Sequence, residues 1–564
     1  MGELIELNPG PTSPLPLKVG AFGTFDKRLS KESDRTRAQN IVRDGAQVLA
    51  DGLRTIDGKP VEVVWSPLMV QDEITADQLA RMFIEQGVRA LVCLPDTWAW
   101  PQKTLLSFLA HFPRKTPIGL TCGNAGPKPG VVFAHASCGA LAQSGILMGL
   151  NVGTWPDTGI RPKMTPETAE AMLDWGQAAI TYTGLRGRRV VEWGHDSMGM
   201  ETALAHVIPT RTQFGLEITR MDMKLLADLL QKDDGYDKSE LKGLEDWMYE
   251  KLGDRIQIRD EADKERFKTM LKMYLIVRNI MEEVNAIGGG FMSQLPWGSD
   301  PRGTPLPVAD AMESLFNSTF DHRGPKPPTP YATEKDTQGL LTMIFFTGLS
   351  GGGPPLFMDF RKVWEPWEIK KVAREMGIPY EGEPWAERGF VDGDNSGSAS
   401  FDWAEKPGAS PDECMARISM PQADPDYFPG RGNSVTFFTP GGVEGVAGRL
   451  AYFQPTDEFT LFWDDAETFE LPEPLAEKVA STSTKEWPHT FVGFKRANMG
   501  QAKQFGCPAN HFKLIANLMP ARVEHFLDIS GIRNMNAIAW PEIREGHRPV
   551  PLIKMLNGAV PPAP

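Results

Sequence analysis

Cysteine is scarce in this sequence, and its spacing excludes two classes of protein. The 564 residues include five cysteines, an odd number, and no two of them form a CxxC pair. Disulfide frameworks use even sets of cysteines, and structural zinc sites commonly use CxxC pairs. We therefore expect neither, and interpret the cysteines as buried thiols in a reducing cytoplasm.

Long apolar runs and excess positive charge are also lacking. No apolar stretch reaches the ~18–20 residues that span a bilayer, and the N-terminus lacks the basic start and apolar core of a signal peptide. The chain has 73 acidic and 59 basic side chains, for a net charge of −14. Because nucleic acids and anionic membranes attract basic surfaces, we expect neither as the main partner.

Strands and helices alternate in the first part of the chain. Strands are predicted at 17–24, 60–65 and 90–94, and helices at 35–53 and 76–86. This alternation is typical of parallel βαβ units, in which ligands bind beside the carboxyl ends of the strands. The loop at 96–102, which contains Trp98, is therefore a candidate pocket wall, or else a loop that packs on its neighbour.

A second α/β unit begins near residue 187, and beyond residue 356 the sequence pattern changes to short strand-like runs between turn residues. Strands are predicted at 188–193 and 214–218, with a helix starting at 200–206 and a long helix at 260–285. Later runs such as 434–438 and 449–453 are short and lie between Gly, Pro and Asp turns, which indicates antiparallel strands. We predict two Rossmann-like α/β domains, at 1–165 and 166–355, followed by a β-rich domain at 356–564.

Two carboxylates lie beside flexible backbone. Glu334, in YATEKD, follows a short strand-like run and precedes an apolar helix at 340–348. Asp359, in LFMDFRKVW, follows the glycine- and proline-rich break at 350–355. Both are predicted at strand ends, where side chains can converge on one point. An acidic residue before a helix is also a common cap, so this pattern alone leaves both interpretations open.

A formal GxSxG match surrounds Ser350 in GLSGG. A nucleophile elbow needs a helix to start straight after the serine. Glycines and two prolines follow instead, so we do not expect a serine hydrolase.

Short segments from about residue 18 to residue 511 resemble the L-fucose isomerase family in order and spacing. They are DSMGM (196–200), MDMKL (221–225), AMESLFNSTF (311–320), YATEKD (331–336), LFMDFRKVW (356–364), NSGSA (395–399), DYFPGRG (426–432), FTPGG (438–442) and PANH (508–511). The resemblance implies a Mn²⁺ ion held by Glu334, Asp359 and His511. It also implies a homo-oligomer, since the family forms hexamers with active sites between subunits.

The residue types of this implied ligand set suit an aldose–ketose isomerase. Carboxylates with one imidazole favour Mn²⁺ or Mg²⁺ over a softer metal. Moving a carbonyl from C1 to C2 requires removal of a proton beside the carbonyl, through an enediol whose charge a divalent cation stabilises. A carboxylate can carry that proton between the two carbons. Glu334 and Asp359 are thus the candidate acid–base pair as well as metal ligands.

The positions that recognise the sugar depart from the family. Phe22 stands where the family has an Arg, Met292 where it has a Gln, with Gln294 nearby, and Asn433 where it has a Tyr. Trp98 matches a pocket Trp that the family contributes from a neighbouring subunit. Because unpaired buried polar groups are costly, L-fucose and D-arabinose are not assumed to be substrates.

Other functions remain open at this stage. Lys27, Arg28 and Arg431 would hold a phosphate or sulfonate on the sugar, or else are solvated surface. The altered pocket is compatible with a non-catalytic sugar-binding or regulatory protein, although the intact Glu, Asp and His favour an enzyme. An epimerase or aldolase would use the same metal site and the same enediolate chemistry.

Overall fold

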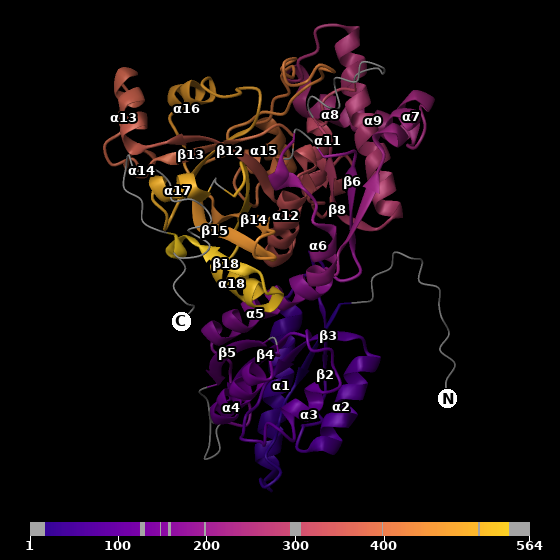
Figure 1. The fold of residues 1–564 in the computed structure, drawn as a ribbon, viewed down its shortest axis with the longest axis vertical. Coiled ribbons are helices and arrows are strands. Elements are labelled where there is room, and N and C mark those ends of the chain that lie inside the picture. The colour runs from indigo at the N-terminus through magenta and orange to yellow at the C-terminus, as the bar shows by residue number, and fades with distance from the viewer. Residues whose placement is uncertain are drawn as a thin grey trace. The chain divides into compact units, whose positions relative to one another are not determined.

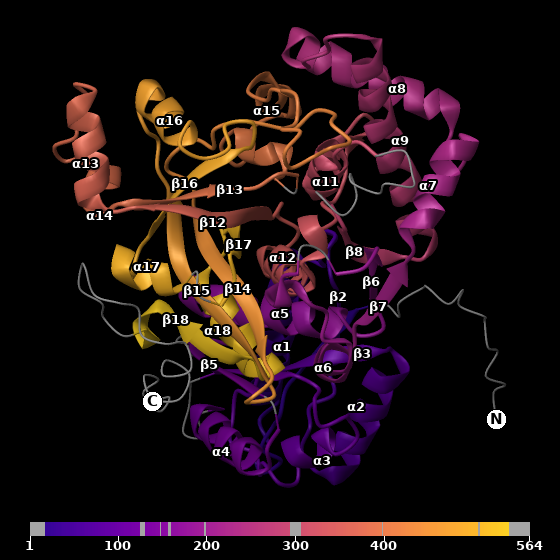
Figure 2. The same ribbon diagram turned by 45° about the horizontal axis from the view of Figure 1, so that its top comes forward.

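The computed structural model describes residues 17–123, 130–146, 148–155, 159–196, 199–293, 306–397, 399–505 and 508–540. By its contacts the chain divides into two compact units (Figures 1 and 2). The first runs to Gly187 and includes Gln213–Gly215 and Met519–Gly531. The second contains Arg188–Thr212, Leu216–Leu518 and the chain from Ile532 onward.

The first unit is built on a parallel sheet with the order β2-β1-β3-β4-β5 (Figure 1). The strands are β1 (Lys18–Phe22), β2 (Glu62–Trp65), β3 (Val88–Cys93), β4 (Ile118–Gly123) and β5 (Met148–Trp155). The helices are α1 (Glu32–Gly52), α2 (Glu73–Glu85), α3 (Leu105–Leu109), α4 (Gly130–Gln143), α5 (Pro166–Gly184) and α18 (Pro520–Ser530). This strand order is that of a doubly wound α/β domain, which confirms the predicted fold class.

Helix α5 extends the first unit past the predicted domain boundary at residue 165. Its N-cap Thr165 accepts a hydrogen bond from the N–H of Thr168, and Pro166 opens the helix. The helix packs on the sheet and on α18, where Nε of Arg522 lies 2.7 Å from Oδ1 of Asp174. These contacts place the end of the unit at Gly187.

The second unit begins with a parallel sheet of order β11-β8-β6-β7. Its strands are β6 (Arg189–Trp193), β7 (Glu217–Met221), β8 (Ala286–Phe291) and β11 (Tyr331–Ala332). Its helices are α6 (Val207–Phe214), α7 (Met223–Lys232), α8 (Lys238–Leu252), α9 (Glu261–Glu283), α11 (Asp310–Asn317) and α12 (Thr337–Ser350). Two two-residue strands, β9 (Phe320–Asp321) and β10 (Gly324–Pro325), form a small hairpin.

A largely antiparallel sheet follows, with the order β14-β17-β12-β13-β16-β15-β18 (Figure 2). Its strands are β12 (Leu356–Trp364), β13 (Phe390–Asp394), β14 (Glu444–Phe453), β15 (Glu458–Thr468), β16 (His489–Phe494), β17 (His511–Ala516) and β18 (Arg533–Asn536). Because β14 also pairs with β15, the sheet closes into a barrel, and β18 adds to β15 in parallel. The predicted β-rich character of the C-terminal part is confirmed, and by its contacts this sheet belongs to the same unit as the parallel sheet before it.

Short helices lie in the segments that connect the barrel strands. One strand predicted in this region, at 434–438, is wrong. The helices are α13 (Pro366–Glu375), α14 (Pro384–Arg388), α15 (Pro411–Ala416), α16 (Glu473–Ala480) and α17 (Met499–Phe505). The run at 434–438 makes only isolated bridges, at Thr436 and Phe438, rather than a strand. Among the helices of the described residues, none has the length and apolar character to span a bilayer.

Candidate metal centre

Glu334 is held by a strained turn between β11 and α12. Glu334 has a φ of 56° and Lys335 a φ of 51°, so two consecutive non-glycine residues adopt the left-handed backbone region. This conformation costs of the order of 1–3 kcal/mol for each residue, and such strain clusters at functional sites. The N–H of Glu334 donates to Oγ of Ser293 at 3.0 Å, which helps to fix the turn. The turn thereby directs the buried carboxylate of Glu334 toward His511.

Asp359 and His511 are brought together by strand register. They are directly paired across β12 and β17, and paired residues project to the same face of a sheet. Oδ1 of Asp359 lies 3.3 Å from Nε2 of His511 and accepts a hydrogen bond from Nδ2 of Asn510 at 2.9 Å. Asp359 is the fourth residue of β12, so its predicted place at a strand end is wrong; the sheet register positions it instead.

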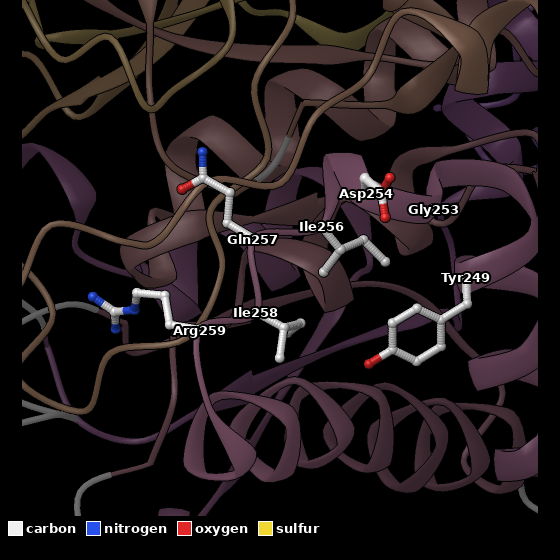
Figure 3. A pocket seen from close by; sticks show the side chains of 7 residues that line it. All are labelled: Tyr249, Gly253, Asp254, Ile256, Gln257, Ile258 and Arg259. Carbon is white, nitrogen blue, oxygen red and sulfur yellow. The ribbon is translucent and has the colours of Figure 1, made fainter.

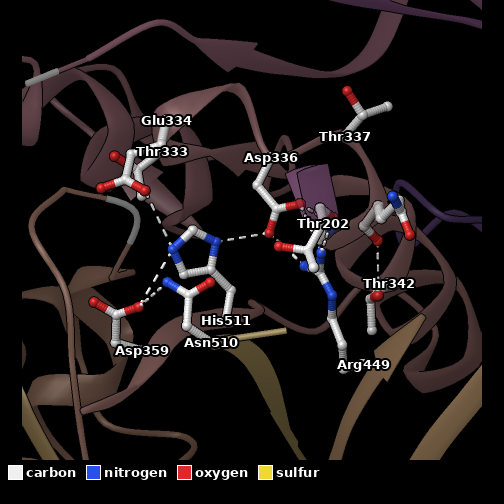
Figure 4. A network of polar contacts seen from close by, with 12 residues as sticks. Thr202, Thr333, Glu334, Asp336, Thr337, Thr342, Asp359, Arg449, Asn510 and His511 are labelled. Carbon is white, nitrogen blue, oxygen red and sulfur yellow. Dashed lines mark hydrogen bonds and ion pairs between the residues drawn. The ribbon is translucent and has the colours of Figure 1, made fainter. Parts of the chain in front are cut away.

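His511 lies between three carboxylates (Figure 4). Its Nε2 is 3.2 Å from Oε2 of Glu334 as well as 3.3 Å from Asp359. Its Nδ1 is 2.9 Å from Oδ2 of Asp336. The three side chains named as metal ligands from the sequence thus converge around one imidazole nitrogen, and the other nitrogen is held by a residue that the sequence analysis did not single out.

Asp336 anchors the site from the first turn of α12. Its Oδ1 caps the helix by accepting the N–H of Gly339 at 2.9 Å. Its carboxylate also pairs with Arg449, whose Nη2 lies 3.0 Å from Oδ1, and Nζ of Lys513 is 3.6 Å from Oδ2. The only sequence signal for Asp336 is its place as a cap two residues after Glu334, and that signal does not reveal its contact with His511.

The charges around His511 oppose the effect of burial. Burial lowers the pKa of His511, but the carboxylates of Asp336, Glu334 and Asp359 outweigh it and raise the pKa to about 9. Burial would raise the pKa of Asp336, but Arg449, Lys513 and His511 hold it well below its usual range. Burial dominates at Asp359 and raises its pKa. Asp336 is therefore the anion behind the imidazole, whereas burial disfavours the charged form of Asp359.

These groups fit a divalent ion. Nε2 of His511 is buried and lies near both carboxylates without the geometry of a hydrogen bond to either, within the part of the chain that the structure describes. When Nδ1 carries the proton that it donates to Asp336, Nε2 of the neutral ring offers its lone pair to the same point. A lone pair beside carboxylates needs a cation, and two oxygens with one imidazole suit Mn²⁺ or Mg²⁺.

Met292 and Asn433, predicted to contact the sugar, lie in the second unit. Met292 is 4% exposed and immediately precedes Ser293, the residue that holds the Glu334 turn. Asn433 is fully buried, and its Nδ2 donates to the carbonyls of Gln257 and Met420 at 3.0 and 2.9 Å. Gln294 lies outside the described residues.

Phe22 and Trp98 lie in the first unit, beside the neighbouring strands β1 and β3. Phe22 ends β1, is fully buried, and stacks on Phe108 with ring centroids 4.3 Å apart. Trp98 follows β3, is half-buried, and meets Phe133 edge-on at 6.3 Å. Phe22 is at the carboxyl end of β1 and Trp98 follows that of β3, at the switch point of the sheet, where ligands of such folds bind. The assignment of these two residues, and of Met292 and Asn433, to a sugar pocket stays a prediction.

Two other sequence features find simple structural roles. Ser350 is the last residue of α12, and strand β12 follows it, which confirms that the GxSxG match is no nucleophile elbow. Arg28 is already paired with Asp26 through a bidentate contact, with Nη2 2.7 Å from Oδ2, and stacks on Trp100.

A surface hollow of about 600 Å³ lies at the end of α8 (Figure 3). Its lining runs from Tyr249 to Arg259 and includes Asp254 and Gln257. Asn433 donates to the carbonyl of Gln257 in this lining. None of the three ligand candidates lines the hollow, so it is distinct from the carboxylate–imidazole cluster.

Comparisons with known proteins agree over most of the chain. The family model for the first N-terminal domain of L-fucose isomerase matches residues 16–187, and that for the second N-terminal domain matches residues 188–351. L-fucose isomerase of Streptococcus pneumoniae serotype 2 (strain D39) is 25% identical over 530 residues, covering 86% of each chain. L-fucose isomerase of Vibrio vulnificus (strain YJ016) is 25% identical over 517 residues, covering 84% of each chain.

Proposed function

Because this chain is a distant member of the L-fucose isomerase family, we propose that it is an aldose–ketose isomerase that uses a divalent metal ion. Glu334, Asp359 and His511 hold the ion, which is Mn²⁺ or a similar hard divalent cation. The protein is proposed to act as a cytoplasmic homo-oligomer on a sugar.

One observation carries this proposal. Nε2 of His511 lies within 3.3 Å of carboxylate oxygens from both Glu334 and Asp359, while Nδ1 is held by Asp336 at 2.9 Å. A metal-binding histidine commonly donates its other ring N–H to a carboxylate, which fixes the tautomer and the ring orientation. A sugar-binding protein without catalysis would have no need of this arrangement.

The chain's own residues supply the proton chemistry. Isomerisation takes a proton from one carbon beside the carbonyl and returns it to the neighbouring carbon through an enediol. A bound divalent ion acts as a Lewis acid toward the carbonyl and hydroxyl oxygens of the sugar. Glu334 and Asp359 are the proposed acid–base pair, since a carboxylate beside the sugar can take the proton from one carbon and return it to the next. Asn510 orients Asp359 by donating to Oδ1.

The sugar itself differs from that of the named relatives in this proposal. Phe22, Met292 and Asn433 replace polar or differently shaped groups, while Trp98 and Gln294 are retained candidates for sugar contact. A site that loses a hydrogen-bond donor leaves the matching sugar hydroxyl unpaired, at a cost of about 1–3 kcal/mol. We therefore expect a substrate whose hydroxyls are arranged differently from those of L-fucose.

The proposal is tested by following deuterium in the sugar. Metal-stripped protein, with and without added Mn²⁺, is incubated in D₂O with aldoses and ketoses, including phosphorylated and sulfonated ones, and followed by proton NMR. Deuterium entry at C1 or C2 together with a new ketose or aldose, dependent on Mn²⁺, is the expected result. Binding without exchange would make the protein a sugar binder. Exchange that gives an epimer or cleavage products would replace isomerisation with epimerase or aldolase chemistry.

A further inference from the structure

A second group of buried ligand-type side chains lies on strands β13 and β16. Asp392, Asp394 and His489 each offer one ligand atom, and these atoms lie within 4.8 Å of one another. Nδ1 of His489 is 2.9 Å from Oδ1 of Asp392 and 3.8 Å from Oδ2 of Asp394. The side chains of Asp392 and Asp394 are fully buried, and His489 is 1% exposed.

The orientation of His489 leaves a specific atom facing the two carboxylates. Its Nε2 lies 3.2 Å from the carbonyl oxygen of Thr484. A carbonyl oxygen only accepts, so Nε2 carries a proton. Nδ1 is in hydrogen-bond contact with Oδ1 of Asp392 at 2.9 Å, so a cation bound there would replace the proton of this contact and take the lone pair of Nδ1. This repeats the arrangement at His511, where one ring nitrogen is anchored and the other faces two carboxylates.

The carboxylates also keep oxygen atoms for a ligand. Within the described residues, Oδ2 of Asp392 is buried without a hydrogen-bond partner. Oδ1 of Asp394 is likewise without a hydrogen bond and lies 3.5 Å from Nε of Arg361, while its Oδ2 accepts a hydrogen bond from Oγ of Ser483 at 2.7 Å. Buried carboxylate oxygens without partners are costly, and a bound cation removes that cost.

We propose that Asp392, Asp394 and His489 form a second divalent-cation site, separate from the one at Glu334, Asp359 and His511. Two ligands about 2.1 Å from one ion are separated by roughly 3.0–3.8 Å when they subtend angles of about 90–130°. The separations of Nδ1 from Oδ1 of Asp392 and Oδ2 of Asp394, 2.9 and 3.8 Å, lie just below that range and at its upper end. One imidazole and two carboxylates favour a transition ion such as Mn²⁺ or Zn²⁺ over Ca²⁺.

The two sites share one row of the barrel. His511, Asp359, Asp394 and His489 are paired in register across the adjacent strands β17, β12, β13 and β16. Arg361 lies between the centres, with Nη1 3.7 Å from Oδ2 of Asp359 and Nε 3.5 Å from Oδ1 of Asp394. It sits where the β12–β13 register shifts, as at a bulge. Arg361 thus contacts one carboxylate of each centre, and the second ion would tie β13 to β16 through Asp394 and His489.

The test counts the ions on the full-length protein. Metal-stripped protein is equilibrated by dialysis against Mn²⁺, and bound manganese is measured by elemental analysis. Two ions per chain are expected for the wild type, one for His489→Gln, one for His511→Gln and none for the double variant. His525→Gln, a histidine outside both clusters, is the matched control and keeps two.

Each outcome separates this site from the proposed function. Suppose the wild type binds one ion, His489→Gln still binds it and His511→Gln does not. That result overturns the second site and leaves the isomerase proposal intact. One ion that only His489→Gln loses supports this site and overturns the ligand set at His511. Asp392→Asn, which keeps the side-chain shape, replaces His489→Gln if that variant does not fold. Two ions in the wild type support both sites, whereas one ion leaves the decision to the variant that loses it.

Discussion

Nδ1 of His511 lies 2.9 Å from Oδ2 of Asp336, and this contact sets which ring nitrogen faces Glu334 and Asp359. Asp336 is buried and is itself held by Arg449, Lys513 and the N–H of Gly339. The orientation of the ring therefore depends on the first turn of α12 and on two basic side chains from the barrel. This dependence makes residues that touch no substrate decisive for the site.

Replacing either acid–base candidate is expected to stop turnover while the fold remains. Glu334→Gln and Asp359→Asn each keep the side-chain shape but remove a metal ligand and a proton carrier. Each should lower kcat by at least about 100-fold, with circular dichroism unchanged. Glu375→Gln, an exposed carboxylate on α13, is the control and should retain full activity. Appreciable activity in both site variants would reject the assignment.

Loss of the Asp336 carboxylate is expected to weaken metal binding without touching a ligand. Asp336→Asn removes the anion that orients His511, and such losses typically lower metal affinity by about 10–100-fold. It also leaves Arg449 buried without its counterion, at a cost of about 3–5 kcal/mol. Mn²⁺ titration and urea unfolding measure the two effects.

Asp263→Asn separates these two effects. Asp263 is also a buried carboxylate with two arginine partners, Arg259 and Arg266. Its loss should lower stability while Mn²⁺ affinity stays at the wild-type value. Wild-type affinity in folded Asp336→Asn would mean that the contact with His511 is not functional.

Metal binding is expected to release a proton from His511. In the metal-free protein its neighbouring carboxylates outweigh burial and raise its pKa to about 9. A metal ion needs the lone pair of Nε2, so below pH 9 it must displace the proton. Apparent Mn²⁺ affinity should rise with pH until about 9 and then level off. Calorimetry in buffers of different ionisation enthalpy counts the protons, and a pH-independent affinity between pH 6 and 9 would contradict this pKa.

A methyl group at Gly339 is expected to destabilise the protein, against the usual trend in helices. The Cβ of Gly339→Ala would lie 2.2 Å from Oδ2 of Asp336 and 2.7 Å from Nη1 of Arg449. Helix propensity alone would instead stabilise the variant by about 0.5–1 kcal/mol. Thermal melting and Mn²⁺ affinity should both fall.

The matched control is Gly243→Ala in α8. Gly243 is exposed, and apart from its chain neighbours and its own helix backbone nothing in the described residues lies within 4 Å of the position that its Cβ would take. This variant should gain the small stabilisation that propensity predicts. If both glycine variants gained stability, the space between α12 and the Asp336–Arg449 pair would be large enough for a methyl group, contrary to the structure.

Local patterns in the sequence predict the first unit well. The strands predicted at 17–24, 60–65 and 90–94 correspond to β1, β2 and β3. β1 and β3 are mostly apolar and buried, as is characteristic of inner parallel strands, whereas β2 is a partly exposed edge strand. The long helix predicted at 260–285 corresponds to α9. The position of the domain boundary depends on which sheet α5 packs against, and a local sequence pattern does not show that packing.

Non-local pairing explains what sequence patterns missed in the barrel. The strand predicted at 434–438 has the right residue types, yet its backbone finds only isolated partners. Asp359 and His511 are neighbours only through the register of β12 and β17. Their assignment to one ligand set came from the family resemblance and not from their spacing in the sequence. Asp392, Asp394 and His489 carried no signal at all, because their grouping depends on the register of β13 and β16.

The most direct test of the proposed centre is an anomalous difference map from crystals of the protein grown with Mn²⁺, recorded at the manganese absorption edge. The account predicts a peak about 2.2 Å from Nε2 of His511 and from a carboxylate oxygen of both Glu334 and Asp359. A map without density at that point, from crystals in which manganese is bound elsewhere on the chain, would contradict it.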